Sequence, residues 1–163
     1  MALQHPVPDN HLKHIGDITV SFAMLEMMLQ TLAQSLLGAG QRLGQIVVAE
    51  LSFKALRALT VSLYLERNGE DAYFKAFREL IKRAADIEQE RNQITHSLWA
   101  AGNDSASVTR VKTTARESRG IHFHFENVTS SQLADFATRI KILADDIQQF
   151  WISLIEAGKA SNG

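Results

Sequence analysis

Cysteine is missing from this chain and proline is rare. The absence of cysteine among its 163 residues excludes disulfide bonds, thiolate zinc sites and cysteine nucleophiles. With only two prolines, few positions interrupt a helix. The sequence also contains neither a Gly-x-Ser-x-Gly nucleophile turn nor a glycine-rich phosphate loop, the motifs of serine hydrolases and of many nucleotide-binding proteins. A formal net charge of -1 excludes a broadly basic surface of the kind that coats DNA.

The composition is that of a globular protein, because 45% of the residues are hydrophobic and 21% are charged. The length predicts one domain over residues 1–163, with residues 1–9 as a flexible N-terminal tail. Residues 1–13 do not resemble a secretion signal, so we expect a cytoplasmic protein. Residues 18–37 are apolar enough to suggest a membrane span, but Glu26, Gln30 and Gln34 interrupt them. We therefore expect no membrane association.

Apolar residues recur every three or four positions over most of the chain, which is typical of packed helices. The expected helices run from about Asn10 to Leu37, from Gln41 to Arg67 with a break near Ser52, from Glu70 to about Ala101, and onward from a capping box at Thr129-Ser130-Ser131-Gln132. The fold class is therefore mainly α: a four- to five-helix up-down bundle with a small β-hairpin inserted before the last helix.

The hairpin is predicted from two alternating segments, Val108 to Thr114 and Ile121 to Val128. One face of the second segment holds Ile121, Phe123 and Phe125, and the other face holds polar side chains. Basic residues on the hairpin and its loop either contact RNA phosphates or are simply solvated. They are Arg110, Lys112, Arg116, Arg119, His122 and His124.

Arg91 stands where an apolar residue is expected. The apolar stripe of the third helix is Tyr73, Phe77, Leu80, Ala84, Ile87, Arg91, Ile94 and Leu98. An arginine on such a stripe either extends its head group to water or needs a carboxylate, carbonyls or a bound anion. At about 100° per residue, Glu88, Asn92 and His96 fall in one sector beside Arg91. This gathering of polar groups predicts a bound group between Arg91 and His96.

The string Arg91-Asn92-x-x-x-His96, on a long penultimate helix of a small helical bundle, resembles the motif of the HEPN superfamily of prokaryotic ribonucleases. The resemblance implies metal-independent cleavage of RNA by a homodimer whose two motifs face a shared cleft. It also implies a role in toxin-antitoxin or phage-defence systems, with an antitoxin protein as a possible partner. One branch of the superfamily has a tyrosine two residues after the histidine, and this chain has Leu98 there.

The chemistry of these side chains agrees with RNA cleavage by the 2′-hydroxyl. His96 is expected to act as acid and base, because imidazole titrates near neutrality, and Arg91 is expected to clamp the phosphate. Asn92 is expected to orient the phosphate or the His96 ring. Glu26 and Glu88 are candidates for a supporting role at this site. Their carboxylates either pair with Arg91 or are ordinary solvated surface charges. No cofactor is expected.

The sequence also raises three alternative functions. A di-iron bundle requires Glu-x-x-His pairs, but Gln93 stands three residues before His96. The pairs His11/His14 and His122/His124 have metal-binding spacings but no evident third ligand, so mobile or surface histidines and no metal site are expected. The alternative to an enzyme is a non-catalytic, dimeric HEPN-like binding or scaffolding module, in which Arg91 is a buried ion-pair residue and His96 caps a helix end.

Overall fold

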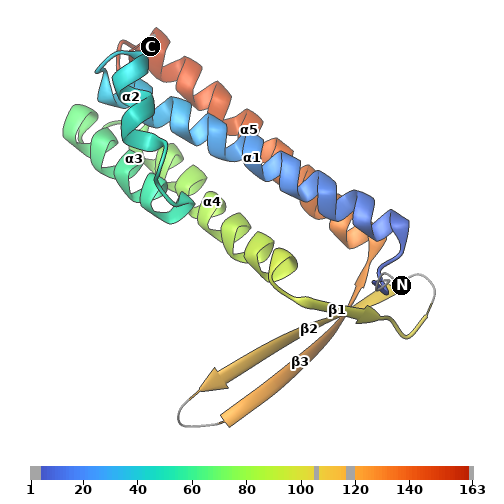
Figure 1. Ribbon diagram of the computed structural model, residues 1–163. Helices are drawn as coiled ribbons and strands as arrows, with labels where there is room; N and C mark the ends of the chain where they lie inside the picture. Colours follow the sequence, from blue (N-terminus) through green and yellow to red (C-terminus); the bar gives the residue numbers. More distant parts are fainter. Residues whose placement is uncertain (1–4, 105–106, 117–119, 162–163) are drawn as a thin grey trace. The chain divides into compact units, whose positions relative to one another are not determined.

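A computed structural model describes residues 5–104, 107–116 and 120–161 of the chain (Figure 1). The helices and strands of these residues are α1 (Asp9–Leu37), α2 (Gln41–Val48), α3 (Phe53–Asn68), α4 (Phe74–Thr95), β1 (Leu98–Ala101), β2 (Ser107–Arg116), β3 (Gly120–Thr129) and α5 (Ser130–Glu156). Most of the described residues are helical. The predicted mainly α fold with a hairpin before the last helix is confirmed.

The chain divides into two compact units, and each is described by itself. The helical unit contains residues 22–88 and 140–161, and the sheet unit contains residues 5–21 and 89–139. The chain passes from one unit to the other within α1, within α4 and within α5. Neither unit is therefore a continuous stretch of sequence.

Several helix ends are set by the local signals that predicted them. Gly38 takes a positive φ of 65° directly after α1, a conformation that glycine adopts without strain. Ser52 caps α3 by accepting a hydrogen bond from the Ala55 N–H at 3.2 Å. At the start of α5, the Thr129 N–H donates to Gln132 Oε1 at 2.8 Å, and the Gln132 N–H donates to Thr129 Oγ1 at 3.2 Å. The predicted break and the predicted capping box are confirmed.

The predicted end of the third helix is wrong. Helix α4 ends at Thr95, and the chain continues as β1 (Figure 1). Leu98–Ala101 pairs antiparallel with Val108–Val111 of β2, so hydrogen bonds to a distant segment replace those of a continued helix. As a result His96 lies in the turn after the helix, and Leu98, predicted as a core residue, is 71% exposed.

The core of the helical unit consists of the predicted apolar seams and an aromatic cluster. The rings of Tyr64 and Phe77 stack with centroids 4.3 Å apart, and Phe150 lies 5.9 Å from Phe77. Stacked aromatic pairs at such distances add to the effect of area burial. Buried aliphatic residues of this unit include Leu25, Leu29, Leu32, Leu36, Leu56, Ala84, Ile140, Leu143, Ile147 and Leu154.

A polar cluster around Asp71 closes one end of this core. The buried Tyr64 donates its hydroxyl to Asp71 Oδ1 at 2.6 Å, the Tyr73 N–H donates to the same oxygen at 3.0 Å, and Lys159 Nζ lies 2.7 Å from Asp71 Oδ2. Desolvation alone raises the pKa of Asp71, but the Lys159 ammonium and the hydrogen bonds from Tyr64 and Tyr73 outweigh it and lower the pKa below its ordinary value. Burial, together with the Asp71 contact, raises the pKa of Tyr64.

The sheet unit contains an antiparallel sheet in the order β1-β2-β3. The predicted hairpin is confirmed, with Arg110 opposite Glu126 and Lys112 opposite His124, whereas β1 was not predicted. Val108 and Val128 pair with each other near the base of the hairpin, and both are buried. His11, expected to be a mobile or surface residue, is instead fully buried with Nε2 3.3 Å from the Val128 carbonyl oxygen.

Among the described residues, α1 has the length and mean hydropathy of a membrane-spanning helix, and 44% of its apolar window is buried within the protein. Buried core helices and N-terminal signal segments meet the same criteria. Length and composition alone are therefore weak evidence for a membrane span.

Candidate functional site

Arg91 and Asn92 lie within the last five residues of α4, in the sheet unit, and both are half-buried. Arg91 Nη1 donates a hydrogen bond to Asn92 Oδ1 at 3.0 Å. The carbonyl of Arg91 accepts a bond from Thr95 Oγ1 at 3.1 Å. Asn92 therefore orients the guanidinium, rather than the imidazole of His96, in this structure.

His96 is the first residue after α4 and its side chain is exposed. Its N–H donates to the Asn92 carbonyl at 3.1 Å, which continues the helical hydrogen-bond pattern one residue past the end of α4. The turn is also held by the Ser97 hydroxyl, which donates to the Gln93 carbonyl, and by Trp99 Nε1, which donates to the Ile94 carbonyl at 3.2 Å. An exposed imidazole thus follows a restrained helix end, a position from which it can exchange protons with a ligand.

A second arginine lies near this turn. Arg110 of β2 forms an ion pair with Glu126 of β3, and its Nη2 is 3.4 Å from Gln93 Oε1 on α4. The side chain of Arg110 is only 13% exposed. The Glu126 carboxylate already neutralises the Arg110 guanidinium. Arg110 therefore serves more to link the sheet to α4 than to bind a phosphate.

The two faces of the sheet differ in charge. Lys112, His122 and His124 are exposed on the face that also carries Arg110. The opposite face exposes apolar side chains: Leu98 (71%), Ile121 (64%), Phe123 (59%) and Phe125 (70%). The alternation of polar and apolar side chains predicted from the sequence is therefore present. Both faces of β3 are nevertheless exposed from its start to the residue before Val128.

The remaining predicted residues are placed as follows. Glu26 and Glu88 are half-buried residues of the helical unit. Arg57 Nη2 lies 2.7 Å from Glu88 Oε2, so this carboxylate has an arginine partner in its own unit. The side chain of Arg116 and the whole of Arg119 lie outside the described residues.

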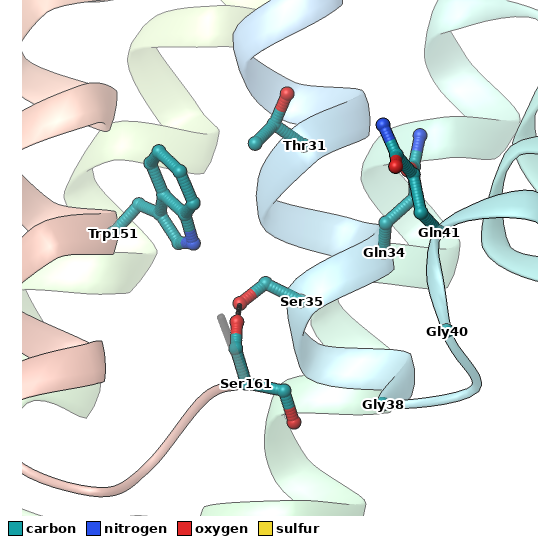
Figure 2. A pocket seen from close by; sticks show the side chains of 8 residues that line it. All are labelled: Thr31, Gln34, Ser35, Gly38, Gly40, Gln41, Trp151 and Ser161. Atoms are coloured by element: carbon teal, nitrogen blue, oxygen red, sulfur yellow. Dashed lines mark hydrogen bonds between the residues drawn. The ribbon is translucent and has the colours of Figure 1, made fainter. Parts of the chain in front are cut away.

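Sequence reasoning missed the two cavities of the helical unit that follow. The first has a volume of about 610 Å³ and is lined by uncharged residues: Thr31, Gln34, Ser35, Gly38, Gly40, Gln41, Trp151 and Ser161 (Figure 2). In Figure 2 the Trp151 indole lies across the cavity from the amides of Gln34 and Gln41. The Trp151 Nε1 atom is buried and has no hydrogen-bond partner among the described residues.

The second cavity is a groove of about 550 Å³ between α3 and α4, lined by Lys54, Arg57, Ala58, Val61, Arg78, Ile81, Lys82 and Ala85. The sequence signal that could have predicted this groove is the recurrence of basic residues at helical spacing. These residues, however, lie on two separate helices. Only the packing of α3 against α4 within the helical unit joins them into one surface.

Comparison of this chain with protein-family models, curated proteins and solved structures found no match.

Proposed function

We propose that this chain is a metal-independent endoribonuclease of HEPN type. His96 acts as acid and base, Arg91 binds the scissile phosphate, and Asn92 holds Arg91 in place. The observation that carries this proposal is that Arg91, held by a 3.0 Å hydrogen bond to Asn92, lies at the same helix end as the exposed His96. An antitoxin protein as partner belongs to the same proposal.

The reaction is a transfer within the RNA. The 2′-oxygen bonds to phosphorus, the bond from phosphorus to the 5′-oxygen breaks, and the electron pair of that bond leaves with the 5′-oxygen. The proton of the 2′-hydroxyl passes to a base, and the 5′-oxygen gains a proton from an acid. The products are a 2′,3′-cyclic phosphate and a 5′-hydroxyl. The guanidinium of Arg91 stabilises the charge that develops on the phosphate oxygens.

A homodimer is part of the proposal, because Arg91 and His96 are five positions apart and diverge around the helix axis. One phosphate is then bound by Arg91 of one copy, while His96 of the other copy exchanges protons with the 2′-hydroxyl and the 5′-oxygen. The exposed apolar face of the sheet is the surface on which a second copy of the chain would pack. No charged side chain lies on that face among the described residues, so two copies can pack these faces together without burying an unpaired charge. Beyond the residues paired with β1, the hairpin is two-stranded, and two strands by themselves are marginally stable in water.

The catalytic proposal is tested on a mixed RNA substrate in the presence of a chelator. We expect the natural chain to produce 2′,3′-cyclic phosphate ends, and His96→Ala to lower the rate roughly 10²- to 10⁴-fold. Arg91→Ala should cause a similar loss. His5→Ala, at an exposed histidine outside the motif, is the matched control and should retain full activity. Equal cleavage by the natural chain and His96→Ala, or none by either, refutes the catalytic assignment.

The dimer is tested separately by light scattering, against the chain mass of 18.2 kDa. Phe125→Ser should shift the protein toward monomer, whereas His124→Ser, the next residue on the opposite face of β3, should not. If both variants keep the oligomeric state of the natural chain, the apolar face is not the dimer interface.

The second candidate function is a non-catalytic binding or scaffolding module. The exposed apolar side chains of β3 favour it, because patches of this kind usually mark interaction sites. Two results together support this function over the first. The natural chain cleaves no RNA, and the His96→Ala variant remains a dimer.

A further inference from the structure

The groove between α3 and α4 has the same composition on both walls. On α3 it is lined by residues 54, 57, 58 and 61, and on α4 by residues 78, 81, 82 and 85. In each case the spacing is i, i+3, i+4 and i+7, which places the four residues on one helix face. Each wall contributes two cations and two apolar residues. The walls extend over about 10 Å, at 1.5 Å per residue.

The charges of the groove are largely uncompensated. Arg57 pairs with Glu88 at 2.7 Å. Lys54, Arg78 and Lys82 are exposed and form no ion pair with any of the described residues. A net positive charge therefore surrounds the groove, although the chain as a whole carries a formal charge of -1. A partner that fits the groove has to supply negative charge.

Between the cations the floor is apolar and consists mainly of small side chains. Ala58 is exposed, Val61 and Ala85 are half-buried, and Ile81 is buried at 8% exposure. Small side chains permit the close approach of a helix backbone, whereas the apolar floor offers no polar side chain to a sugar hydroxyl. Among the described residues, no aromatic side chain on which a base can stack lines the groove.

From these observations we infer that the groove docks an amphipathic helix of a partner protein, with glutamates or aspartates on both flanks of an apolar stripe. The apolar side chains of the partner occupy the floor at i, i+3 or i+4, and i+7, and its carboxylates meet Lys54, Arg78 and Lys82. The groove lies wholly in the helical unit. This inference is independent of the proposed ribonuclease activity.

The probe is a fluorescent helical peptide of roughly 16 residues, with leucines on the stripe and glutamates on both flanks. A matched peptide carries glutamine in place of each glutamate, and a single-stranded RNA oligonucleotide tests the alternative class of partner. Binding to the full chain is followed by fluorescence anisotropy. We expect the glutamate peptide to bind at least about 10-fold more tightly than the glutamine peptide, and its affinity to fall with added salt.

Variants of exposed residues locate the site. Arg78→Glu and Lys82→Glu should each weaken binding of the glutamate peptide roughly 3- to 10-fold. Arg42→Glu, an exposed arginine on α2 outside the groove, is the matched control and should change it less than about twofold. Ala58→Gln fills part of the floor without changing the charge, and should also weaken peptide binding. Circular dichroism verifies that each variant keeps its helices.

Three results overturn the inference. The first is equal binding of the two peptides, or binding of neither. The second is unchanged affinity for the glutamate peptide in Arg78→Glu. The third is RNA binding that Arg78→Glu abolishes and Ala58→Gln leaves intact, because the groove then recognises phosphates instead of a helix.

Discussion

Replacing Asp71 by alanine should destabilise the helical unit strongly. Asp71 accepts hydrogen bonds from the Tyr64 hydroxyl and the Tyr73 N–H, and Lys159 pairs with its second oxygen. Since Tyr64 is fully buried, its hydroxyl depends on Asp71 for the hydrogen bond that it donates. The variant therefore loses charged hydrogen bonds and leaves a buried donor without a partner.

The expected loss follows from these contacts. A hydrogen bond to a charged group contributes about 1.5–3 kcal/mol, and an unsatisfied buried hydroxyl costs about 1–3 kcal/mol. The Lys159 pair adds at most about 1 kcal/mol, because its side chains are 30% and 15% exposed to solvent. These contributions overlap, so we expect the free energy of unfolding to fall by about 2–4 kcal/mol. For a chain of this size the Tm should fall by roughly 5–15 °C.

Urea unfolding followed by circular dichroism measures this loss. Glu70→Ala is the matched control, because Glu70 is the neighbouring acid and is exposed, and its effect should stay within about 0.5 kcal/mol. Tyr64→Phe keeps the stacked ring and removes only the hydroxyl, so it should cost less than Asp71→Ala. An Asp71→Ala variant as stable as Glu70→Ala would show that the cluster does not stabilise the fold.

The same cluster predicts a pH dependence. The pKa of Asp71 is lowered in the folded protein, so the folded state favours the carboxylate more than the unfolded chain does. The resulting stability is present at neutral pH, above the ordinary carboxyl pKa of about 3.9. It is lost as the pH falls through the lowered folded-state pKa. The difference in unfolding free energy between the natural chain and Asp71→Asn should therefore shrink between about pH 5 and pH 2.

Two further variants test local structure. Gly102→Ala should destabilise the sheet unit by about 1–3 kcal/mol in thermal unfolding, because a Cβ there meets the Ser107 carbonyl oxygen at 2.2 Å; an unchanged Tm would contradict the close approach of these two backbones. Thr129→Ala removes the acceptor for the Gln132 N–H and should cost about 1 kcal/mol in chemical unfolding, whereas Ser131→Ala, an exposed neighbour, should cost much less.

Much of the fold could be predicted because its signals are local. Gly38 ends α1, Ser52 begins α3, and the capping box begins α5, and each depends on residues within one turn. The end of α4 depends instead on β1 pairing with β2 about ten residues later. Leu98 continues the helical period of the sequence, so periodicity alone extended the helix past His96.

The candidate site could be predicted only in part for the same reason. Arg91 was identified because a charge interrupts an apolar stripe, and it is indeed half-buried. Its hydrogen bond to Asn92, an adjacent residue on the helix, depends on side-chain rotamers that a helix wheel does not give. The pairing of Arg110 with Glu126 and the groove between α3 and α4 arise from segments that only the folded chain brings together.

The passage of the chain between its two units within three helices has a practical consequence for dissecting this protein. A gene fragment that encodes one unit by itself would have to be assembled from separated pieces, each beginning or ending with part of a severed helix. Exposed helix ends of this kind lack caps and leave backbone groups unpaired. Truncation is therefore a poor tool here, and point substitutions in the intact chain are the way to assign roles to either half.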